Sequence, residues 1–96
     1  MPRDLRKLAK GKECQVRIPG VCNGNPETVV LAHYSMAGIS GKGIKSPDIM
    51  GAWACSACHD ECDRRTQHHD RETVRLSHAE GVFRTQKALY DMGVIR

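Results

Sequence analysis

The C-terminal quarter of the chain carries the clearest hydrophobic pattern. Between residues 72 and 96, apolar side chains recur at intervals of three and four, which places them on one side of a helix. These positions are Leu76, Ala79, Val82, Phe83, Ala88, Leu89 and Met92. The pattern predicts an amphipathic helix that turns this stripe toward the core, and Gly93 is a suitable residue to end it.

Two short apolar runs predict strands. Residues 28–34, TVVLAHY, are rich in β-branched and apolar side chains and predict a strand with His33 near its end. Residues 48–55, DIMGAWAC, form a second candidate strand, and a loop with three glycines separates the two. A shorter helix is predicted for residues 56–67, because good helix formers follow one another there and acidic residues in its early turns suit the helix dipole.

The first twelve residues form a basic segment. Leu5, Leu8 and Ala9 lie at loose helical spacing and predict a short helix that ends at Gly11. The chain contains no internal repeat and no low-complexity segment. We therefore expect a basic N-terminal segment over residues 1–12, followed by one domain over residues 13–96, with a small α+β fold.

Composition adds that this domain needs a source of stability besides its core. The chain has 96 residues and only four aromatic side chains. A domain of this size buries only about 60% of the surface that its unfolded chain exposes. The opening residues, MPRDLRKLAKGKE, contain no apolar run suited to a signal peptide or a membrane span. We expect a cytoplasmic location and no membrane association, and in that reducing compartment cysteines more often bind metal than form disulfides.

The spacing of the cysteines indicates a structural zinc ion. Seven residues separate Cys14 from Cys22, and two separate Cys55 from Cys58. The close pair is the stronger signal, because a tight turn brings both thiolates to one ion; a seven-residue gap is longer than usual. The alternative is that Cys14 and Cys22 are unrelated buried thiols. Cys62 follows one helical turn after Cys58 and is expected to be a packing residue rather than a substitute ligand.

The letters CSACH, residues 55–59, also match the attachment sequence of a c-type haem. Covalent haem attachment requires export and an oxidising compartment, and the sequence shows no signal for either, so no haem is expected. A thioredoxin-like redox role is not expected either, because no βαβ pattern surrounds the two cysteines. The four-cysteine zinc site is the preferred interpretation.

Three side chains outside the cysteine set have the chemistry of a hydrolytic site. His59 and Asp63 lie four residues apart on the predicted helix and so face the same way, which suits one divalent cation. His33 ends the first predicted strand, where it can activate a water beside a cation-bound phosphate. The alternative is that His33 is a hydrogen-bonded strand residue and His59 is an ordinary surface residue.

The charge is moderately basic, with 15 Lys and Arg against 11 Asp and Glu and a net charge of +4. Such an excess permits a polyanionic partner without requiring one. We expect Lys42, Lys45, Arg64 and Arg65 to contact the phosphates of DNA. Each basic cluster taken alone is also typical of a solvated surface.

The stretches ECQVRIPGVCNGNPET, VVLAH and ACSACHDECDRR resemble the HNH, or ββα-metal, nucleases, and in particular the small prophage-encoded YbcO-like nucleases. The resemblance extends over nearly the whole chain, from Leu5 to Ile95. It implies a zinc-stabilised ββα-metal domain with an additional C-terminal helix. It also implies the site: His33 as general base, His59 as ligand of a catalytic Mg²⁺ or another divalent cation, and Cys14, Cys22, Cys55 and Cys58 as zinc ligands.

Two positions depart from the HNH pattern. Many HNH nucleases have Asp or His immediately before the base, where this chain has Ala32. The Asn that normally orients the base is also missing, and the nearest polar residue before the cysteine pair is Asp48. Asp63 and Asp48 are both candidates for the missing metal ligand. The sequence therefore leaves two functions open: a metal-dependent endonuclease acting on DNA, of phage or prophage origin, and a zinc-stabilised nucleic-acid-binding protein without catalysis.

Overall fold

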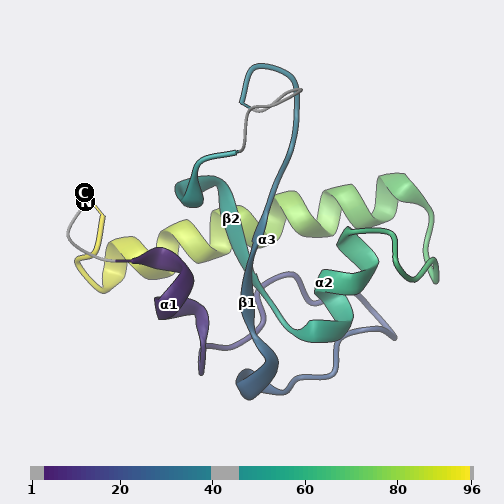
Figure 1. Cartoon of the computed structure of the whole chain (residues 1–96), viewed down its shortest axis with the longest axis horizontal. Helices are drawn as coiled ribbons and strands as arrows, with labels where there is room; N and C mark the ends of the chain where they lie inside the picture. Colours follow the sequence, from purple (N-terminus) through teal and green to yellow (C-terminus); the bar gives the residue numbers. More distant parts are fainter. Residues whose placement is uncertain (1–3, 40–45, 96) are drawn as a thin grey trace.

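The computed structural model describes residues 4–39 and 46–95 and shows a small α+β fold (Figure 1). The predicted phosphate contacts Lys42 and Lys45 lie outside the described residues. None of the described helices is long and apolar enough to cross a membrane. The elements, in chain order, are helix α1 (Leu5–Ala9), the 3₁₀ turn η1 (Pro26–Thr28), strand β1 (Val30–His33), the 3₁₀ turn η2 (Asp48–Met50), strand β2 (Gly51–Ala54), and helices α2 (Ser56–Cys62) and α3 (Arg71–Asp91).

The two strands form one antiparallel pair in which His33 lies opposite Gly51. Both strands start later than predicted, because a 3₁₀ turn occupies the first part of each predicted run. The outer edge of β2 is closed by polar contacts on both sides of Trp53. Its N–H donates to the Thr85 hydroxyl at 2.9 Å, and its carbonyl accepts from the Gln15 N–H at 2.7 Å. These bonds satisfy backbone groups that an edge strand would otherwise leave unpaired.

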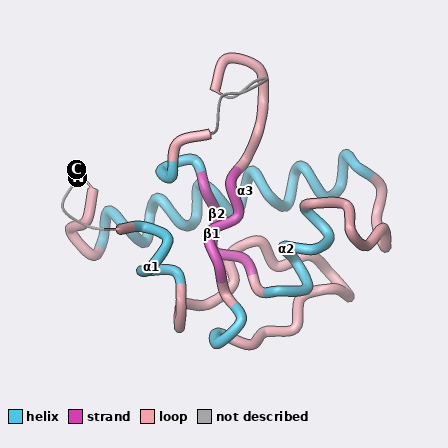
Figure 2. Tube along the Cα trace, viewed as in Figure 1, coloured by secondary structure: helices cyan, strands magenta, loops and turns pink. Residues whose placement is uncertain are grey.

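Helix α3 runs behind the sheet along the length of the molecule, as Figures 1 and 2 show. The Asp70 side chain caps its first turn by accepting from the Thr73 N–H. Its end confirms the predicted role of Gly93, which adopts a φ of 77°. The N–H of Gly93 donates to the carbonyl of Tyr90, and that of Val94 to the carbonyl of Leu89, which is the Schellman arrangement of a helix end.

The predicted core stripe of α3 is wrong for about half of its members. Leu76 is 62% exposed, Phe83 70% and Met92 43%. The buried face instead consists of Val74, His78, Gly81, Val82, Thr85 and Leu89. Three of these six are small or polar, because α3 lies close to neighbouring backbone and forms hydrogen bonds to it. The apolar pattern therefore describes two opposite faces of the helix, of which only one is covered.

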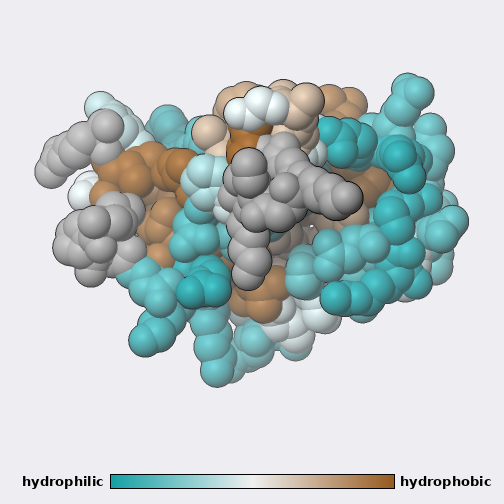
Figure 3. All heavy atoms as spheres, turned by 45° about the horizontal axis from the view of Figure 1, so that its top comes forward, coloured by the Kyte–Doolittle hydropathy of each residue, from teal (hydrophilic) through white to brown (hydrophobic). Residues whose placement is uncertain are grey.

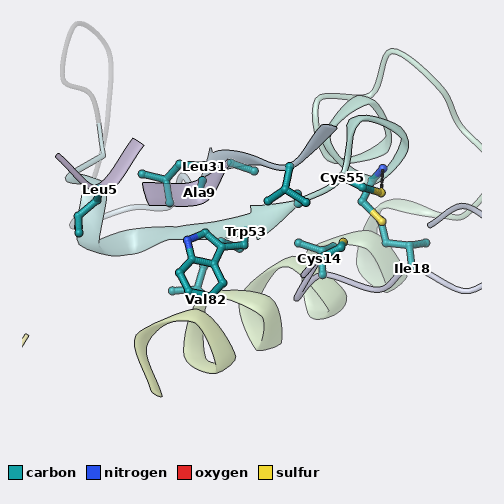
Figure 4. Close-up of a cluster of buried hydrophobic side chains, with 14 of the residues drawn as sticks. Leu5, Ala9, Cys14, Ile18, Leu31, Trp53, Cys55 and Val82 are labelled. Carbon is teal, nitrogen blue, oxygen red and sulfur yellow. Dashed lines mark hydrogen bonds between the residues drawn. The ribbon is translucent and has the colours of Figure 1, made fainter. Parts of the chain in front are cut away.

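The core lies between the sheet and α3, and Figure 4 shows Trp53 there beside Val82. Leu5 and Ala9 of α1 are buried in the same cluster. The predicted short basic helix is confirmed in this segment. The sequence interpretation set residues 1–12 apart from the domain, whereas the apolar side of α1 packs against the shared core.

Helix α2 ends five residues earlier than predicted, at Cys62. The cause is the buried side chain of Glu61, whose carboxylate accepts from the Thr66 hydroxyl and from the His69 N–H at 2.8 Å. These bonds turn the chain back over the end of the helix, and Arg64 takes a positive φ of 61° in the turn. Burial raises the pKa of Glu61, but the hydrogen bonds outweigh it and hold the pKa below its ordinary value.

Candidate functional site

Four of the five cysteines come together in one cluster. Cys14 and Cys22 flank a loop before β1, Cys55 is the N-cap of α2, and Cys58 lies in its first turn. The four Sγ atoms lie within 4.8 Å of one another, and none of the cysteines is in a disulfide. Zinc–sulfur bonds of about 2.3 Å in a tetrahedron place the sulfur atoms about 3.8 Å apart. The distance between the Cys22 and Cys55 sulfur atoms is 3.8 Å, so these residues fit a zinc ion.

Backbone N–H groups point at the sulfur atoms of this cluster. The N–H of Arg17 lies 3.5 Å from the Cys14 sulfur, and those of Asn23 and Cys58 lie 3.4 Å from the Cys55 sulfur. Such donors stabilise thiolates, the form that binds metal. The hydrogen bond between the Cys58 thiol and Cys14 lowers the pKa of Cys14 to about 4 and raises that of Cys58. The local geometry therefore favours negative charge on the Cys14 sulfur, whereas burial raises the pKa of the Cys22 thiol.

Cys62, the fifth cysteine, lies outside this cluster. Its side chain is half-buried at the end of α2, and burial raises the pKa of its thiol to about 12. A neutral thiol is a poor metal ligand and a poor nucleophile. This placement agrees with the expectation that Cys62 is a packing residue.

His33 and Asp48 form a close pair at the end of the sheet. The distance between His33 Nε2 and Asp48 Oδ1 is 2.7 Å. An ionised carboxylate can only accept a hydrogen bond, so His33 donates through Nε2 and keeps the lone pair on Nδ1. Antiparallel pairing brings the two together, because Asp48 begins the turn that leads into β2 opposite the end of β1. The structure thus brings Asp48 to His33.

His59 and Asp63 form the pair expected on α2. The distance between His59 Nε2 and Asp63 Oδ2 is 3.3 Å. Two ligand atoms at right angles around an ion, each about 2.1 Å from it, are about 3.0 Å apart, so the pair fits neighbouring positions on one divalent cation. Among the described residues, only the cysteine cluster gathers three or more ligand groups. The α2 pair therefore offers two protein ligands.

One hollow of about 130 Å³ is lined by one member of each pair. Its walls include His33 from the sheet and Asp63 from the end of α2, while His59 is not part of the wall. Helix α3 contributes two further residues that the sequence interpretation missed, Arg75 and His78. The Arg75 guanidinium lies over the Tyr34 ring at 4.8 Å and donates to the Ser35 carbonyl at 3.3 Å. No local motif marks either residue, since each reaches the hollow only through the packing of α3.

His78 is a structural residue at the base of this hollow. Its Nε2 bonds the carbonyl oxygen of Ala32 at 2.8 Å, and its ring meets Tyr34 edge-on. Burial lowers the pKa of His78, which favours the neutral ring. His78 thus ties α3 to β1 directly behind His33.

The two predicted phosphate contacts in the described part of the chain already have partners. Arg64 donates to the His69 carbonyl at 3.1 Å, and Arg65 lies 3.0 Å from Asp60 and 3.4 Å from Asp63. In Figure 3, hydrophilic residues cover the end of the molecule where α2 ends and α3 begins. Arg65 is partly neutralised by its acidic neighbours, so it is a weaker candidate for phosphate binding than Arg64.

Comparison with known proteins identifies relatives that match nearly the whole chain. The family model described as "Putative nuclease YbcO" matches residues 3–94. Two relatives, "Putative nuclease YbcO" of Escherichia coli strain K12 and "Putative nuclease ybcO" of Enterobacteria phage 82, are each 57% identical over 93 residues, which is 97% of this chain and 97% of each relative. A solved structure described as "Structure of a putative bacteriophage protein from Escherichia coli str. K-12 substr. MG1655" superposes with a TM-score of 0.81 at 53% identity, over 94% of this chain and 100% of that one. Because the family model covers residues 3–94 and both relatives match over 97% of the chain, this chain belongs to the YbcO family, which has members in a bacterium and in a phage.

Proposed function

We propose that this protein is a metal-dependent endonuclease of the HNH type that hydrolyses phosphodiester bonds in DNA. One observation carries the proposal. His33, oriented by a carboxylate, shares a hollow with Asp63, which belongs to a pair of metal-ligand side chains on α2. A base and a cation site on either side of one small hollow are the two components that hydrolysis of a phosphodiester requires. The family membership supports action on nucleic acid.

In this proposal, His33 is the catalytic base and Asp48 its positioning residue. Nδ1 of His33 takes the proton of the attacking water, while Asp48 accepts from Nε2 and fixes the ring. Asp48 thus assumes the orienting role of the Asn that the HNH pattern would place before the cysteine pair. A carboxylate also stabilises the imidazolium formed when the base gains its proton, which an Asn amide does less well.

His59 and Asp63 would hold the catalytic cation, such as Mg²⁺, which would neutralise charge on the phosphate and on the leaving oxygen. Ala32 offers no ligand at the position where many HNH nucleases have one. Water and phosphate oxygens would complete the coordination, as is usual for Mg²⁺. We further propose that zinc on Cys14, Cys22, Cys55 and Cys58 fixes the start of α2 and thereby the direction of His59.

The second candidate is a zinc-stabilised nucleic-acid-binding protein without catalysis. The observation that favours it is the small number of ligands on α2, where two side chains approach each other without a third among the described residues. A site with two protein ligands binds a cation weakly. Loss of one ligand during evolution would leave the fold and the basic surface intact.

Cleavage of supercoiled plasmid in Mg²⁺, Mn²⁺ or Ni²⁺ distinguishes the two functions. We expect cleavage by the native protein and a loss of about a hundredfold or more in His33→Ala, the usual range for a general base. His68→Ala is the matched control, because His68 is exposed in the turn after α2. Asp48→Ala should reduce the rate more than Asp48→Asn, since Asn still accepts a hydrogen bond from Nε2.

Zinc content and thermal unfolding should be unchanged in His33→Ala, which separates loss of chemistry from loss of fold. Equal cleavage by the native protein and His33→Ala would contradict the assignment of the base. Binding to DNA without cleavage in any of the three ions would favour the second candidate.

A further inference from the structure

A second hollow adjoins the first and is lined by three arginines. It has a volume of about 150 Å³, and its walls are formed by Cys62, Arg64, Arg71, Val74 and Arg75. Cys62, Val74 and Arg75 line both hollows, so the two share one wall. No carboxylate lines the second hollow. The described part of the chain contains no ion pair that involves any of its three arginines.

Two of these guanidinium groups are held in place by carbonyl oxygens. Arg64 donates to His69, and Arg75 donates to Ser35 while it stacks on Tyr34. A guanidinium carries five N–H donors, so most remain available after one such bond. Three cations around one hollow repel one another, and an anion placed among them relieves that repulsion. The planar donor sets of arginine suit phosphate oxygens in particular.

We propose that the hollow formed by Arg64, Arg71 and Arg75 binds a backbone phosphate of the nucleic acid next to the one that faces His33. The shared wall at Arg75 makes the two hollows suited to consecutive phosphates of one strand. This inference rests on the proposed function in taking nucleic acid as the ligand. It assigns binding to Arg71 and Arg75, which lie on α3 and belong to no recognised motif.

The test measures binding of a short DNA duplex by fluorescence anisotropy at several salt concentrations, in the His33→Ala background and without divalent cation. Each phosphate contact contributes to the slope of log affinity against log salt. Arg71→Gln and Arg75→Gln should each weaken binding and reduce that slope by about one. Arg6→Gln is the matched control, because Arg6 is exposed on α1 at the opposite end of the molecule (Figure 1), and should leave the slope unchanged.

Unchanged slopes in both α3 variants, or no binding of the duplex at low salt, would overturn the inference. Thermal unfolding of each variant shows whether the loss reflects binding or folding, since Arg71 has an exposed side chain and Arg71→Gln is expected to fold normally. If the native protein fails to cleave DNA but the slopes change as expected, the phosphate site stands and the proposed catalysis fails. If it cleaves with unchanged slopes, only the phosphate site fails.

A separate observation concerns the uncovered face of α3. Leu76, Phe83 and Tyr90 are spaced by seven residues, and their exposed fractions are 62%, 70% and 61%. Seven residues are nearly two helical turns, so the three form one ridge on the side of α3 opposite the core. Such a row of large apolar side chains in water marks an interaction surface.

The charged residues beside the ridge are placed so that they would meet opposite charges on a second copy packed in antiparallel orientation. Glu80 and Lys87 lie on the same flank, also seven residues apart, and both are exposed. Within α3, Glu80 lies 3.9 Å from Arg84 and Lys87 lies 2.7 Å from Asp91, and both contacts are at the surface, where they can exchange for contacts across an interface. When two α3 helices pack antiparallel about a two-fold axis near Phe83, Glu80 lies beside the partner's Lys87, and Leu76 lies beside the partner's Tyr90. Because such a contact is isologous, the pairing of Glu80 with Lys87 occurs twice, once from each copy to the other. A hollow of about 240 Å³ beside Phe83, lined with apolar side chains from Met36, Ile39 and Ala79, can receive the partner's Phe83.

We infer that the ridge formed by Leu76, Phe83 and Tyr90 binds a second copy of this chain in antiparallel orientation. Light scattering after size-exclusion chromatography over a range of protein concentrations should show a dimer that Phe83→Glu converts to monomer. Glu80→Lys should weaken the dimer by placing like charges opposite each other, and Glu80→Lys combined with Lys87→Glu should restore it. A native protein that is monomeric at every concentration, or a dimer unaffected by Phe83→Glu, would overturn this inference.

Discussion

Two imidazoles close to the end of β1 have opposite surroundings. His33 is partly exposed and paired with a carboxylate at 2.7 Å, whereas His78 is buried and bonded to a backbone carbonyl. The first setting tolerates a positive charge on the ring, and the second opposes it. The residue proposed to gain a proton during the reaction is therefore the one placed beside a negative charge, and the residue that holds the fold stays neutral.

The burial of His78 makes stability depend on pH. Burial lowers the folded-state pKa of His78 below that of the unfolded chain, which is about 6.5 for histidine. The stabilisation is therefore complete above about pH 6.5 and is lost as the pH falls from there through the lower folded-state pKa. The negative charge of Asp63 opposes this lowering of the His78 pKa, while the charges of His59 and Arg75 add to it. We expect the free energy of unfolding to decrease from pH 7.5 to pH 5.5.

His78→Gln isolates this effect. The Gln amide can still donate to the Ala32 carbonyl but does not titrate, so the variant should lose less stability than the native protein over the same pH range. Urea unfolding of both proteins at each pH measures the difference, and the shared cysteine cluster contributes equally to both. Parallel pH profiles would show that His78 does not carry the effect.

At the scale of elements, helix α3 shows which features of the fold are determined by residues that are neighbours along the chain. The helix, its Asp70 cap and its Gly93 end follow from residues that are neighbours along the chain. The choice of buried face does not, because apolar residues are present on two opposite faces. What decides between them is contact with distant segments: Thr85 bonds to β2, and Gly81 lies against the loop after Cys14.

The same distinction applies to the candidate site. The four cysteines and the His59–Asp63 pair could be predicted, because their spacing along the sequence carries the signal. The partner of His33 could not be chosen from sequence, since Asp48 reaches it only through the pairing of β1 with β2. Arg75 comes from an element more than forty residues beyond β1's start and has no motif of its own.

Gly81 tests how closely α3 approaches its neighbours. A Cβ atom at this position would lie 3.0 Å from both the Cα and the Cγ2 of Val16, and 3.2 Å from the Gln15 carbonyl oxygen. Helix propensity alone favours Gly81→Ala by about 1 kcal/mol. Overpacking typically costs about 1 to 3 kcal/mol, so we expect a net loss of stability.

Urea unfolding of Gly81→Ala measures this balance. Ser77→Ala, at a partly exposed position in the middle of the same helix, is the control in which helix propensity acts without a close steric contact. That control should be neutral or slightly stabilising. A stabilised Gly81→Ala would mean that α3 can move away from the Val16 loop at little cost.

The whole molecule is thin, with extents of 37 × 32 × 18 Å. A body about 18 Å across holds little more than one layer of side chains between its surfaces, here the layer between the sheet and α3. The cysteine cluster lies beside that layer and joins the loop from Cys14 to Cys22 to the start of α2. A metal bound there would connect segments that the core alone holds weakly.

Removal of the metal should therefore affect the entire fold. Structural zinc contributes about 10 to 16 kcal/mol in zinc-finger peptides, which is comparable with or larger than the net stability of about 5 to 15 kcal/mol of a typical domain. Thiolates left without an ion repel one another, which adds to the loss. We expect elemental analysis to find about one zinc per chain, and chelation or Cys55→Ser to abolish cooperative thermal unfolding.

Cys62→Ala is the matched control, because Cys62 lies outside the cluster. The variant should retain its zinc, and its free energy of unfolding should fall by at most about 1 to 2 kcal/mol, as expected for a small half-buried side chain. If the zinc-free protein unfolded cooperatively at the same temperature as the zinc-containing native protein, the core alone would suffice for the fold. If Cys62→Ala lost as much zinc as Cys55→Ser, the set of four cysteine ligands would be wrong.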